Sequence, residues 1–467
     1  MNLSIADIAK AANGEIINNN NIIIKNITKD SRKVLSDSLY WSIQGEIFDG
    51  HDFIFEAVEN GALGVVAREE AVKRFDLQSR NMTVIAVKDT VQALLDFAKY
   101  YKNLHKNLDK LDKIIAVTGS VGKTTAKEFM YSVLSEKFKT QKSGGNFNNE
   151  IGMPFTLFEL EKDTEAVVLE MGMSGFGEIK RLSESANPDM AVITNIGTSH
   201  ISNLGSREGI KKAKFEILDG MAYDSDIILN ADDNMLYSER NKTERKEYFF
   251  GINNEEADFI AEEIEFDYNK NISAFTVDKI KFKIPAAGTH NIYNALPALI
   301  AGKIYGLSNE EIQGGFNNFE NAKMRQNIYA LNDITNIIII DDCYNASLES
   351  VKAAVETLAN INKSKKIAVL SDVLESGSFS GEIHRKIGEA LLYKKIDKVY
   401  LFGENSKITY ETVKQGGGEC VYFEDKSEIA SELFRELKEL RECAVLFKAS
   451  RGMAMETVLE DLKKNMR

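Results

Sequence analysis

The chain has few of the residues that form disulfides, bind metals or restrict the backbone: three cysteines, five histidines and four prolines in 467 residues. Cys343, Cys420 and Cys443 are odd in number and far apart, which excludes a disulfide framework and a thiolate metal cage. The sequence also lacks an apolar run of 18 residues and a cationic stretch before an apolar core. We therefore expect no membrane insertion, no signal peptide and a cytoplasmic location.

Positive charge is also in short supply. Lysine and arginine total 58 against 71 acidic residues, which gives a net charge of −13. A protein that coats nucleic acid needs a surface that neutralises phosphates, so we expect no nucleic-acid partner. The length is too great for one ordinary domain, and roughly three domains are expected.

The most informative segment is the stretch Gly119-Ser120-Val121-Gly122-Lys123-Thr124-Thr125. It follows an apolar run over 114–117 and precedes residues with helical spacing. A strand, a glycine turn and a helix are the parts of a phosphate-binding loop, whose N–H groups wrap a phosphate. The lysine would reach the outer phosphates of a nucleoside triphosphate, and a threonine hydroxyl would bind Mg²⁺. The glycine pattern is the short Gly-x-x-Gly-Lys-Thr form, and the alternative is a strand–turn–helix without a ligand.

Apolar runs separated by helical patterns predict an α/β fold with three domains. We expect a small N-terminal α/β module over 1–110, a central domain with a mostly parallel sheet over 111–322, and a doubly wound, Rossmann-like domain over 323–467. A helix over 94–113 would link the first two, and residues 316–323 would link the last two. The predicted strands are 114–117, 166–169, 190–194, 226–229, 337–340, 367–370, 398–402, 420–423 and 444–447. The predicted helices include 54–60, 348–361, 383–394, 405–415, 427–440 and 453–464.

Three side chains are candidates for a metal site beside the phosphate loop. Glu170 ends a predicted strand, and in a parallel sheet its carboxylate would emerge near the loop and could hold Mg²⁺. His200 follows the next strand, and its neutral imidazole could ligate a metal. Lys214 would be repelled by Mg²⁺ unless neutral or modified. Each has a plainer alternative: a solvent-facing Glu, a loop histidine and a solvated helix lysine.

Several polar loops could hold a substrate. Asn146, Asn148 and Asn149 carry amides that suit sugar and peptide groups, although a plain loop is nearly as consistent. Asn291 could read a purine edge or cap its helix. Asp342 follows a strand, where doubly wound sheets bind ligands, or it could cap the next helix. Ser450 and Arg451 follow the last strand in a turn suited to a carboxylate.

In these motifs the chain resembles the Mur ligase superfamily, the ATP-dependent amide-forming ligases of peptidoglycan precursor synthesis. The resemblance runs nearly end to end and is most specific in residues 145–154, 341–346 and 448–453. Residues 30–33 and 45–51 look like that family's uridine-nucleotide domain. The Asp-Asn-Pro-Arg motif of the relative that adds diaminopimelate or lysine is absent.

The resemblance implies a role for each matching residue. Lys123 and Thr124 would hold ATP phosphates and Mg²⁺, Glu170 and His200 would serve the metal ions, and Lys214 matches a lysine that is carbamylated in the superfamily. Asn291 would contact adenine, and Arg325 and Asp342 would bind ATP from the third domain. The substrate contacts would come from Ser31, Arg32, Phe48, Asp49, Gly50, His51, Asn146, Asn148, Asn149, Tyr344, Asn345, Ser450 and Arg451.

The implied reaction joins D-alanyl-D-alanine to the terminal carboxylate of UDP-N-acetylmuramoyl-tripeptide through an acyl phosphate, in a monomeric enzyme. Two alternatives remain at this point. One is another Mur-type or folylpolyglutamate-type amide ligase, and residues 45–51 argue against the folate case. The other is a nucleotide-dependent switch or assembly protein without ligase activity, against which the metal carboxylate and the third domain argue.

Overall fold

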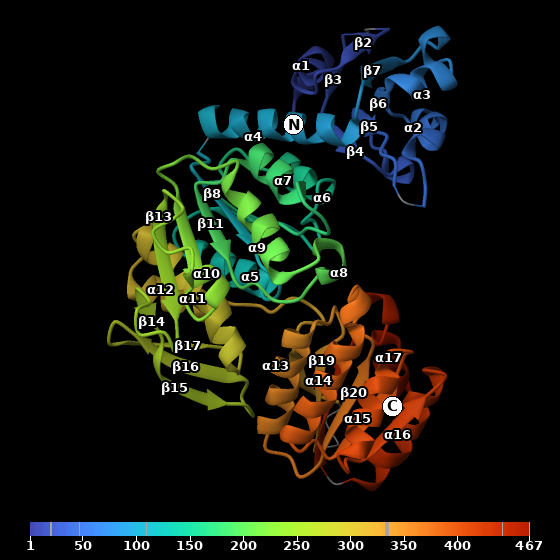
Figure 1. The fold of residues 1–467 in the computed structure, drawn as a ribbon. Helices are drawn as coiled ribbons and strands as arrows, with labels where there is room; N and C mark the ends of the chain where they lie inside the picture. The colour runs from blue at the N-terminus through green and yellow to red at the C-terminus, as the bar shows by residue number, and fades with distance from the viewer. Residues whose placement is uncertain (19–20, 46, 109, 332–335, 441, 467) are drawn as a thin grey trace.

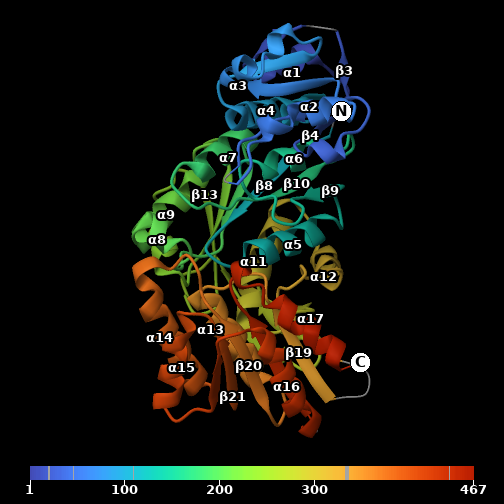
Figure 2. The same cartoon turned by 90° about the vertical axis from the view of Figure 1, so that its right-hand side faces the viewer.

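A computed structural model describes residues 1–18, 21–45, 47–108, 110–331, 336–440 and 442–466. The N-terminal part of the chain lies at one end of the molecule, the C-terminal part at the other, and the central part between them (Figures 1 and 2). The structure is α/β throughout, as predicted. None of the described helices is both long and apolar enough to span a bilayer.

The N-terminal module contains a five-stranded sheet in the order β2-β7-β6-β5-β4, in which β4 to β7 are parallel and β2 is antiparallel to β7. A separate antiparallel pair joins β1 to β3. Helix α2 confirms the helix predicted near residue 54. The elements are β1 (Leu3–Ser4), α1 (Ile5–Ala11), β2 (Glu15–Ile17), β3 (Ile23–Ile24), β4 (Asn26–Thr28), η1 (Ser31–Lys33), β5 (Ser38–Trp41), η2 (Gly50–Phe53), α2 (Ile54–Glu59), β6 (Gly64–Arg68), α3 (Glu69–Arg74), η3 (Leu77–Ser79) and β7 (Thr83–Val87).

Helix α4 (Thr90–Leu108) joins this module to the central domain. It begins four residues before the predicted linking helix and ends five residues earlier. Its Phe97 lies between Trp41 of the module, with ring centroids 5.8 Å apart, and Phe158 of the central domain, at 5.1 Å. The apolar face of α4 therefore packs on both neighbours, which is why a Lys-rich sequence forms a stable helix here.

The central domain is built on a seven-stranded parallel sheet in the order β14-β13-β12-β11-β8-β10-β9. Helices α5, α11 and α12 pack on one face, and α4, α6, α7 and α9 on the other. The four predicted strands are confirmed as β8, β10, β11 and β12. The elements are β8 (Lys113–Thr118), α5 (Lys123–Leu134), β9 (Thr140–Lys142), α6 (Gly152–Phe158), β10 (Ala166–Glu170), α7 (Glu178–Ala186), β11 (Met190–Ile193), α8 (Ile201–Leu204), α9 (Arg207–Phe215), η4 (Glu216–Leu218), β12 (Asp226–Asn230), α10 (Asn234–Tyr237), β13 (Lys246–Gly251), β14 (Phe259–Ile260), α11 (Thr289–Ile304) and α12 (Asn309–Asn317).

A three-stranded antiparallel sheet, which we did not predict, is inserted before α11. It consists of β15 (Glu262–Asp267), β16 (Ile272–Val277) and β17 (Ile280–Ile284). Its charged, alternating sequence gives a weak signal because only one face is apolar. On that face Phe275 and Phe282 pack against Phe316 of α12.

The C-terminal domain has a six-stranded sheet in the order β18-β19-β23-β20-β21-β22, parallel except for the edge strand β18. This doubly wound arrangement and its five parallel strands confirm the prediction; β18 was not predicted. The last strand lies between β19 and β20, which pairs Lys448 with Asp342 in register. The elements are β18 (Asn327–Ala330), β19 (Asn336–Asp342), α13 (Leu348–Asn360), β20 (Lys366–Ser371), η5 (Gly377–Phe379), α14 (Ser380–Tyr393), β21 (Lys398–Phe402), α15 (Ser406–Gln415), β22 (Cys420–Phe423), α16 (Ser427–Glu439), β23 (Glu442–Lys448), η6 (Arg451–Met453) and α17 (Glu456–Asn465).

The predicted linker over 316–323 begins inside the end of α12. Phe319 stacks on Phe129 of α5, with ring centroids 3.7 Å apart. The chain leaves the central domain only after this contact. The linker is therefore anchored on the helix that begins at the phosphate loop.

Candidate active site

The phosphate loop (residues 119–125) has a backbone shape that only glycine can take at two positions. Gly119 has φ +150° and Gly122 has φ +85°. A Cβ on Gly119 would lie 1.9 Å from Oγ1 of Thr194, and one on Gly122 would lie 2.2 Å from Oδ1 of Asn294. The two glycines therefore serve both the turn and the close approach of β11 and α11.

The loop is braced by the residues that follow β11. Asn195 accepts a hydrogen bond from the N–H of Val121 at 3.0 Å, and its amide donates to the carbonyl of Val121 at 3.0 Å. The N–H of Gly197 donates to the hydroxyl of Ser120 at 2.9 Å. These bonds hold the loop in shape before any ligand arrives, which lowers the cost of binding.

Lys123, at the start of α5, folds back over the loop. Its ammonium donates to the carbonyl of Gly119 at 2.7 Å and to that of Ser120 at 3.3 Å. Loss of surrounding water lowers the pKa of Lys123 to about 8, while the charge of Glu170 opposes this shift. A phosphate group would supply the anionic partner that this ammonium lacks.

Glu170 ends β10, where it is buried, as its strand position predicts. Its Oε1 accepts a hydrogen bond from the amide of Asn148 at 2.9 Å, and its Oε2 lies 3.9 Å from the ammonium of Lys127. Oε2 has no hydrogen-bond partner in the described part of the chain. A buried carboxylate oxygen without a partner is costly, so this atom is available to a cation.

Lys214 is buried on α9, so the solvated alternative is excluded. Burial, reinforced by the nearby charge of Lys123, lowers the pKa of Lys214 well below its usual value. No carboxylate among the described residues lies within ion-pair distance of its ammonium. The side chain is therefore placed where a neutral or modified amine is favoured over a cation.

His200 precedes α8 and has a left-handed backbone, with φ +61°. Its Nδ1 lies 2.7 Å from Oε2 of Glu375, which belongs to the C-terminal domain. The contact with His200 lowers the pKa of the Glu375 carboxyl. The loop histidine thus forms part of the junction between two domains.

These residues fit a hard cation in the chemistry of their donors. No group of three or more His, Cys, Asp and Glu side chains in the described ranges is placed to share a metal. The predicted set contains only two such residues, Glu170 and His200. The orphaned oxygen of Glu170 is an oxygen donor of the kind Mg²⁺ prefers, and so is the hydroxyl of Thr124, a residue that lines the cavity over the phosphate loop.

A cavity of about 650 Å³ extends from the phosphate loop to the C-terminal domain. Residues of both domains line it, so the nucleotide site predicted from sequence is assembled across the junction. Among the lining residues are Ser120, Val121, Gly122, Lys123, Thr124, Thr125, Asn291, Arg325, Asp342 and Asn345. Asn291 donates its amide to the carbonyl of Ala287 at 2.9 Å, but it does not cap α11, whose N-cap is Gly288 without a side-chain hydrogen bond; its amide oxygen stays available.

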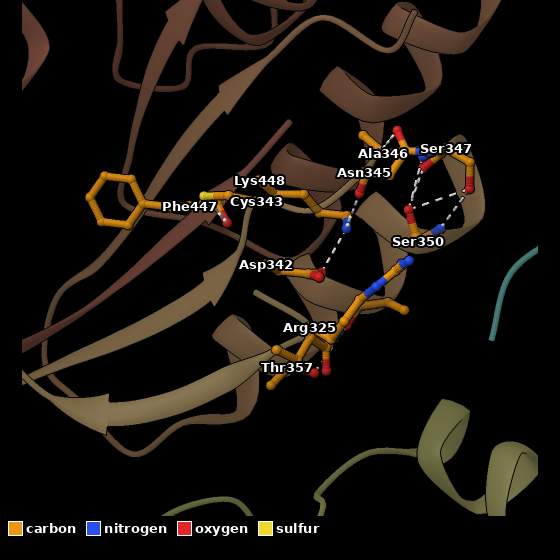
Figure 3. Close-up of polar contacts among 12 residues, drawn as sticks. Arg325, Asp342, Cys343, Asn345, Ala346, Ser347, Ser350, Thr357, Phe447 and Lys448 are labelled. Carbon is orange, nitrogen blue, oxygen red and sulfur yellow. Dashed lines mark hydrogen bonds and ion pairs between the residues drawn. The ribbon is translucent and has the colours of Figure 1, made fainter. Parts of the chain in front are cut away.

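Figure 3 shows the C-terminal side of this cavity. Lys448 donates to the carboxylate of Asp342 at 2.6 Å and to the carbonyl of Asn345 at 3.0 Å, and Lys448 and Asp342 are both buried. The Arg325 guanidinium lies 3.9 Å from the ring centroid of Tyr344. Tyr344, a predicted dipeptide ligand, therefore supports Arg325, and its contact with a dipeptide stays a prediction.

A smaller cavity of about 170 Å³ joins the phosphate loop to the predicted dipeptide residues. Lys123, His200, Asn345, Ser450 and Arg451 all contribute to its lining. The hydroxyl of Ser450 accepts a hydrogen bond from the N–H of Leu374 at 2.9 Å, and Arg451 pairs with Glu456 at 2.8 Å. The structure thus brings the predicted dipeptide side next to the lysine of the phosphate loop.

The three asparagines predicted to bind substrate differ in their contacts and exposure. Asn148 holds Glu170, whereas Asn149 accepts hydrogen bonds from the N–H groups of Ile151 and Gly152 and so caps α6. Asn146 is exposed. Only Asn148 therefore reaches the nucleotide side through a contact that the structure shows.

The predicted uridine-nucleotide residues lie in the N-terminal module, away from the phosphate loop (Figure 1). Ser31 donates to Glu56 at 3.0 Å, and the guanidinium of Arg32 is paired with Asp30 while remaining 79% exposed. Phe48 is 69% exposed. An exposed arginine and aromatic ring on one module are free to meet an anionic ligand and its base.

His51 has a structural place in the same module. Its ring is buried, with Nδ1 2.6 Å from Asp49 and with Nε2 accepting from the N–H of Arg68 at 3.1 Å. Gly50 passes so close to Ile43 that a Cβ would lie 2.6 Å from its backbone nitrogen. These contacts shape the loop, and Glu46 within it lies outside the described residues.

The sequence analysis did not identify several residues that contact the predicted site residues or the loop that carries them. Lys127 and Glu375 each approach a predicted metal ligand, and Glu349 accepts from the hydroxyl of Thr198 at 3.1 and 3.2 Å across the junction. Lys127 could have been found, because it lies one turn after Lys123 on the same helix. Nothing in the spacing of Glu349 and Glu375 indicates contacts with a loop 150 or more residues earlier.

Comparison with known proteins identifies the family that shares this architecture. Family descriptions match three stretches: the Mur ligase family catalytic domain over residues 23–102, the Mur ligase middle domain over 117–302, and the Mur ligase glutamate ligase domain over 325–451. The UDP-N-acetylmuramoyl-tripeptide–D-alanyl-D-alanine ligase of Bacillus subtilis is 36% identical, with 98% of each chain covered. This chain belongs to the Mur ligase family. The enzyme of the same name from Escherichia coli is 29% identical to this Mur ligase over 100% of the chain and 99% of its own.

Solved structures agree with this family and its three-domain fold. MurF from Acinetobacter baumannii superposes with a TM-score of 0.90, at 29% identity, with 99% of each chain covered. MurF from Thermotoga maritima, solved in complex with ADP, gives a TM-score of 0.81 at 28% identity, with 95% of this Mur ligase and 98% of that chain covered. The arrangement of the three domains is thus the one found in these ligases.

Proposed function

We propose that this Mur ligase uses ATP to join the amine of D-alanyl-D-alanine to the terminal carboxylate of UDP-N-acetylmuramoyl-tripeptide, in peptidoglycan precursor synthesis. The observation that carries the proposal is the preformed phosphate loop, which faces the predicted dipeptide residues across a domain junction. The names and coverage of the similar ligases support the choice of substrates.

The chemistry follows from the weak electrophilicity of a carboxylate. A carboxylate oxygen attacks the γ-phosphorus of ATP, ADP leaves, and an acyl phosphate forms. The amine then adds to the acyl carbon, and the tetrahedral intermediate expels inorganic phosphate as the amide forms. Lys123 lies where it would bind the transferred phosphoryl group, and Arg325 would hold the nucleotide from the third domain.

A divalent cation is part of the proposal. Thr124, Glu170 and His200, and Lys214 if carbamylated, are the residues that would hold Mg²⁺. When bound, Mg²⁺ neutralises charge that develops on the phosphates. Within the chain, Asn148 donates a hydrogen bond to one oxygen of Glu170, and the ammonium of Lys127 lies 3.9 Å from the other. Thr124, in the first turn of α5, lines the cavity over the phosphate loop.

Carbamylation of Lys214 is supported by its lowered pKa and its burial. The neutral amine adds to carbon dioxide, a C–N bond forms, a proton is released, and the product is an anionic carbamate. Enzyme equilibrated with ¹³C-bicarbonate should show one protected carbamate signal by ¹³C NMR, absent from Lys214→Arg. Identical spectra for the two proteins would contradict the modification.

The three parts of the chain have separate tasks in this proposal. The module over 1–110 holds the UDP group through Ser31, Arg32 and the loop that contains Phe48 and Asp49. The part over 111–322 binds ATP, and the part over 323–467 presents the dipeptide. Closure of three domains excludes water from the acyl phosphate and brings the amine close to it.

The test is phosphate release from ATP, with the UDP-tripeptide and the dipeptide added singly and together and with the product identified by mass. The expected result is release that requires both substrates, with UDP-N-acetylmuramoyl-pentapeptide appearing. Release that ignores muramoyl peptide but responds to a protein partner would instead favour a nucleotide-dependent switch. No release with either a lysine- or a diaminopimelate-containing tripeptide would overturn the substrate assignment.

A further inference from the structure

A loop of the C-terminal domain reaches the histidine beside the phosphate loop. This junction loop, residues 372–377, connects β20 to η5. Its Glu375 places Oε2 2.7 Å from Nδ1 of His200, a close approach whose angle leaves Nδ1 without a hydrogen bond in the described part of the chain. Its backbone carbonyl accepts a hydrogen bond from the hydroxyl of Ser202 at 2.9 Å. The loop therefore docks on the turn that carries His200 through both a side chain and the backbone.

The backbone at this contact is unusual on both sides. His200 has φ +61° and Glu375 has φ +57°, and neither is glycine. L-residues with a side chain take the left-handed region at a cost, and such residues cluster at functional sites when the surrounding structure enforces them. Both sides of this contact therefore have a backbone conformation that the surrounding structure must hold in place.

The junction loop is fixed firmly to its own domain. The N–H of Leu374 donates to the hydroxyl of Ser450 at 2.9 Å, and the N–H of Val373 donates to Nε2 of His384 at 3.2 Å. The Ser376 hydroxyl closes the turn on the carbonyl of Val373 at 2.9 Å. The position of Glu375 is thus set by the third domain, including Ser450 on the predicted dipeptide side.

Stability alone does not explain this ion pair. The side chain of Glu375 is 62% exposed, and an ion pair with so exposed a member contributes little to folding. A carboxylate next to Nδ1, however, decides which imidazole nitrogen carries the proton. With the proton on Nδ1, the lone pair of Nε2 is free for a cation, and the ring orientation is fixed.

We propose that Glu375 is a positioning residue for His200: docking of the C-terminal domain sets the imidazole in the Nδ1–H form, so that Nε2 is ready to ligate the divalent cation. The ligand set is then complete only when the domain that presents the dipeptide is in place. This inference rests on the metal role given to His200 in the proposed function.

The first test measures cation binding without turnover. Mn²⁺ is titrated into the full-length protein with a non-hydrolysable ATP analogue, and free Mn²⁺ is followed by electron paramagnetic resonance. Glu375→Ala should weaken Mn²⁺ binding about tenfold, the size typical for loss of a group that orients a metal ligand. Glu375→Gln should have an intermediate effect, because its amide oxygen still accepts from Nδ1–H.

Ser202→Ala is the matched control. It removes the other contact of the same loop without touching the imidazole, so Mn²⁺ affinity should stay unchanged. An effect of Ser202→Ala as large as that of Glu375→Ala would show that Glu375 only holds the two domains together, and it would contradict the proposal. Unchanged affinity in Glu375→Ala would also overturn the inference.

The second readout is the protonation pattern of His200. The chain has five histidines, so ¹⁵N-histidine spectra are simple, and His200→Asn assigns the signal. Wild type should show the Nδ1–H form, and Glu375→Ala should shift toward Nε2–H; an unchanged pattern would contradict the proposal. If His200→Asn itself leaves Mn²⁺ affinity intact, the metal role of His200 fails, which separates that failure from a failure of Glu375 alone.

Discussion

The phosphate loop and the domain junction are built in different ways. The loop is held by glycine geometry and by hydrogen bonds between the Asn195 side chain and the backbone of Val121, all within the central domain. The junction depends on polar side chains from the other domain, chiefly Glu349 on Thr198 and Glu375 on His200. The phosphate loop is therefore braced within one domain, whereas the cavities beside it are lined by residues of two domains.

The largest expected effect comes from the loop itself. Lys123→Ala should lower kcat roughly 10³-fold, as expected when a preorganised charge at a phosphoryl group is removed. Steady-state phosphate release measures this loss, and circular dichroism checks the fold. A loss below tenfold would show that the loop lysine does not serve the transferred phosphate.

The buried ion pair of the third domain provides the next test. Lys448→Met leaves the Asp342 carboxylate buried without its partner, which should destabilise that domain by about 3 kcal/mol. Urea unfolding followed by a probe in the C-terminal domain measures this change. Lys464→Met, which removes an exposed pair with Asp461, should leave the urea midpoint almost unchanged. Equal effects would contradict the buried character of the first pair.

The pH dependence of nucleotide binding tests the charge of Lys123 separately from the other site residues. In the free protein its pKa is lowered to about 8, so the ammonium is present below pH 8 and is lost as pH rises above it. A bound phosphate raises this pKa again. ADP affinity should therefore fall above pH 8, by up to about tenfold per pH unit, with proton uptake on binding. Calorimetry in two buffers measures both, and Lys123→Arg should remove the dependence because guanidinium stays charged.

The smallest expected effect concerns Glu349 at the junction. Its carboxylate lines the same cavity as the phosphate loop and should repel an anionic nucleotide. Glu349→Gln should therefore tighten ADP binding about threefold, a size suited to a partly solvated charge. Weaker binding would show that the carboxylate helps to hold the nucleotide.

Most of the fold could be predicted because the parallel strands are continuous apolar runs separated by helical patterns. The segments ending in Glu170 and Asp342 illustrate this, since the first is buried throughout and the second is buried over most of its apolar run. The sheet formed by β15, β16 and β17 was missed because its exposed face carries Glu and Lys residues. Its strands therefore lack the continuous apolar runs by which the other strands were recognised. The edge strand β18 was missed because it is short and only half-buried, so its apolar pattern is weak.

The site could be predicted only in part. Local motifs placed the phosphate loop, Glu170 and His200 correctly at one edge of the sheet, because parallel strands end together. Contacts across domains leave no local pattern, so Glu375 and Glu349 were not found. Side chains that serve the loop shape, such as His51 and Asn149, resemble ligand-binding residues in sequence and are told apart only by their internal hydrogen bonds.

The most direct test of the proposed reaction follows one oxygen atom. UDP-N-acetylmuramoyl-tripeptide labelled with ¹⁸O in its terminal carboxylate is turned over with ATP and D-alanyl-D-alanine, and the released phosphate is analysed by mass. Transfer through an acyl phosphate predicts one ¹⁸O in each phosphate released. Unlabelled phosphate would show that ATP is cleaved by water and would contradict the proposed mechanism.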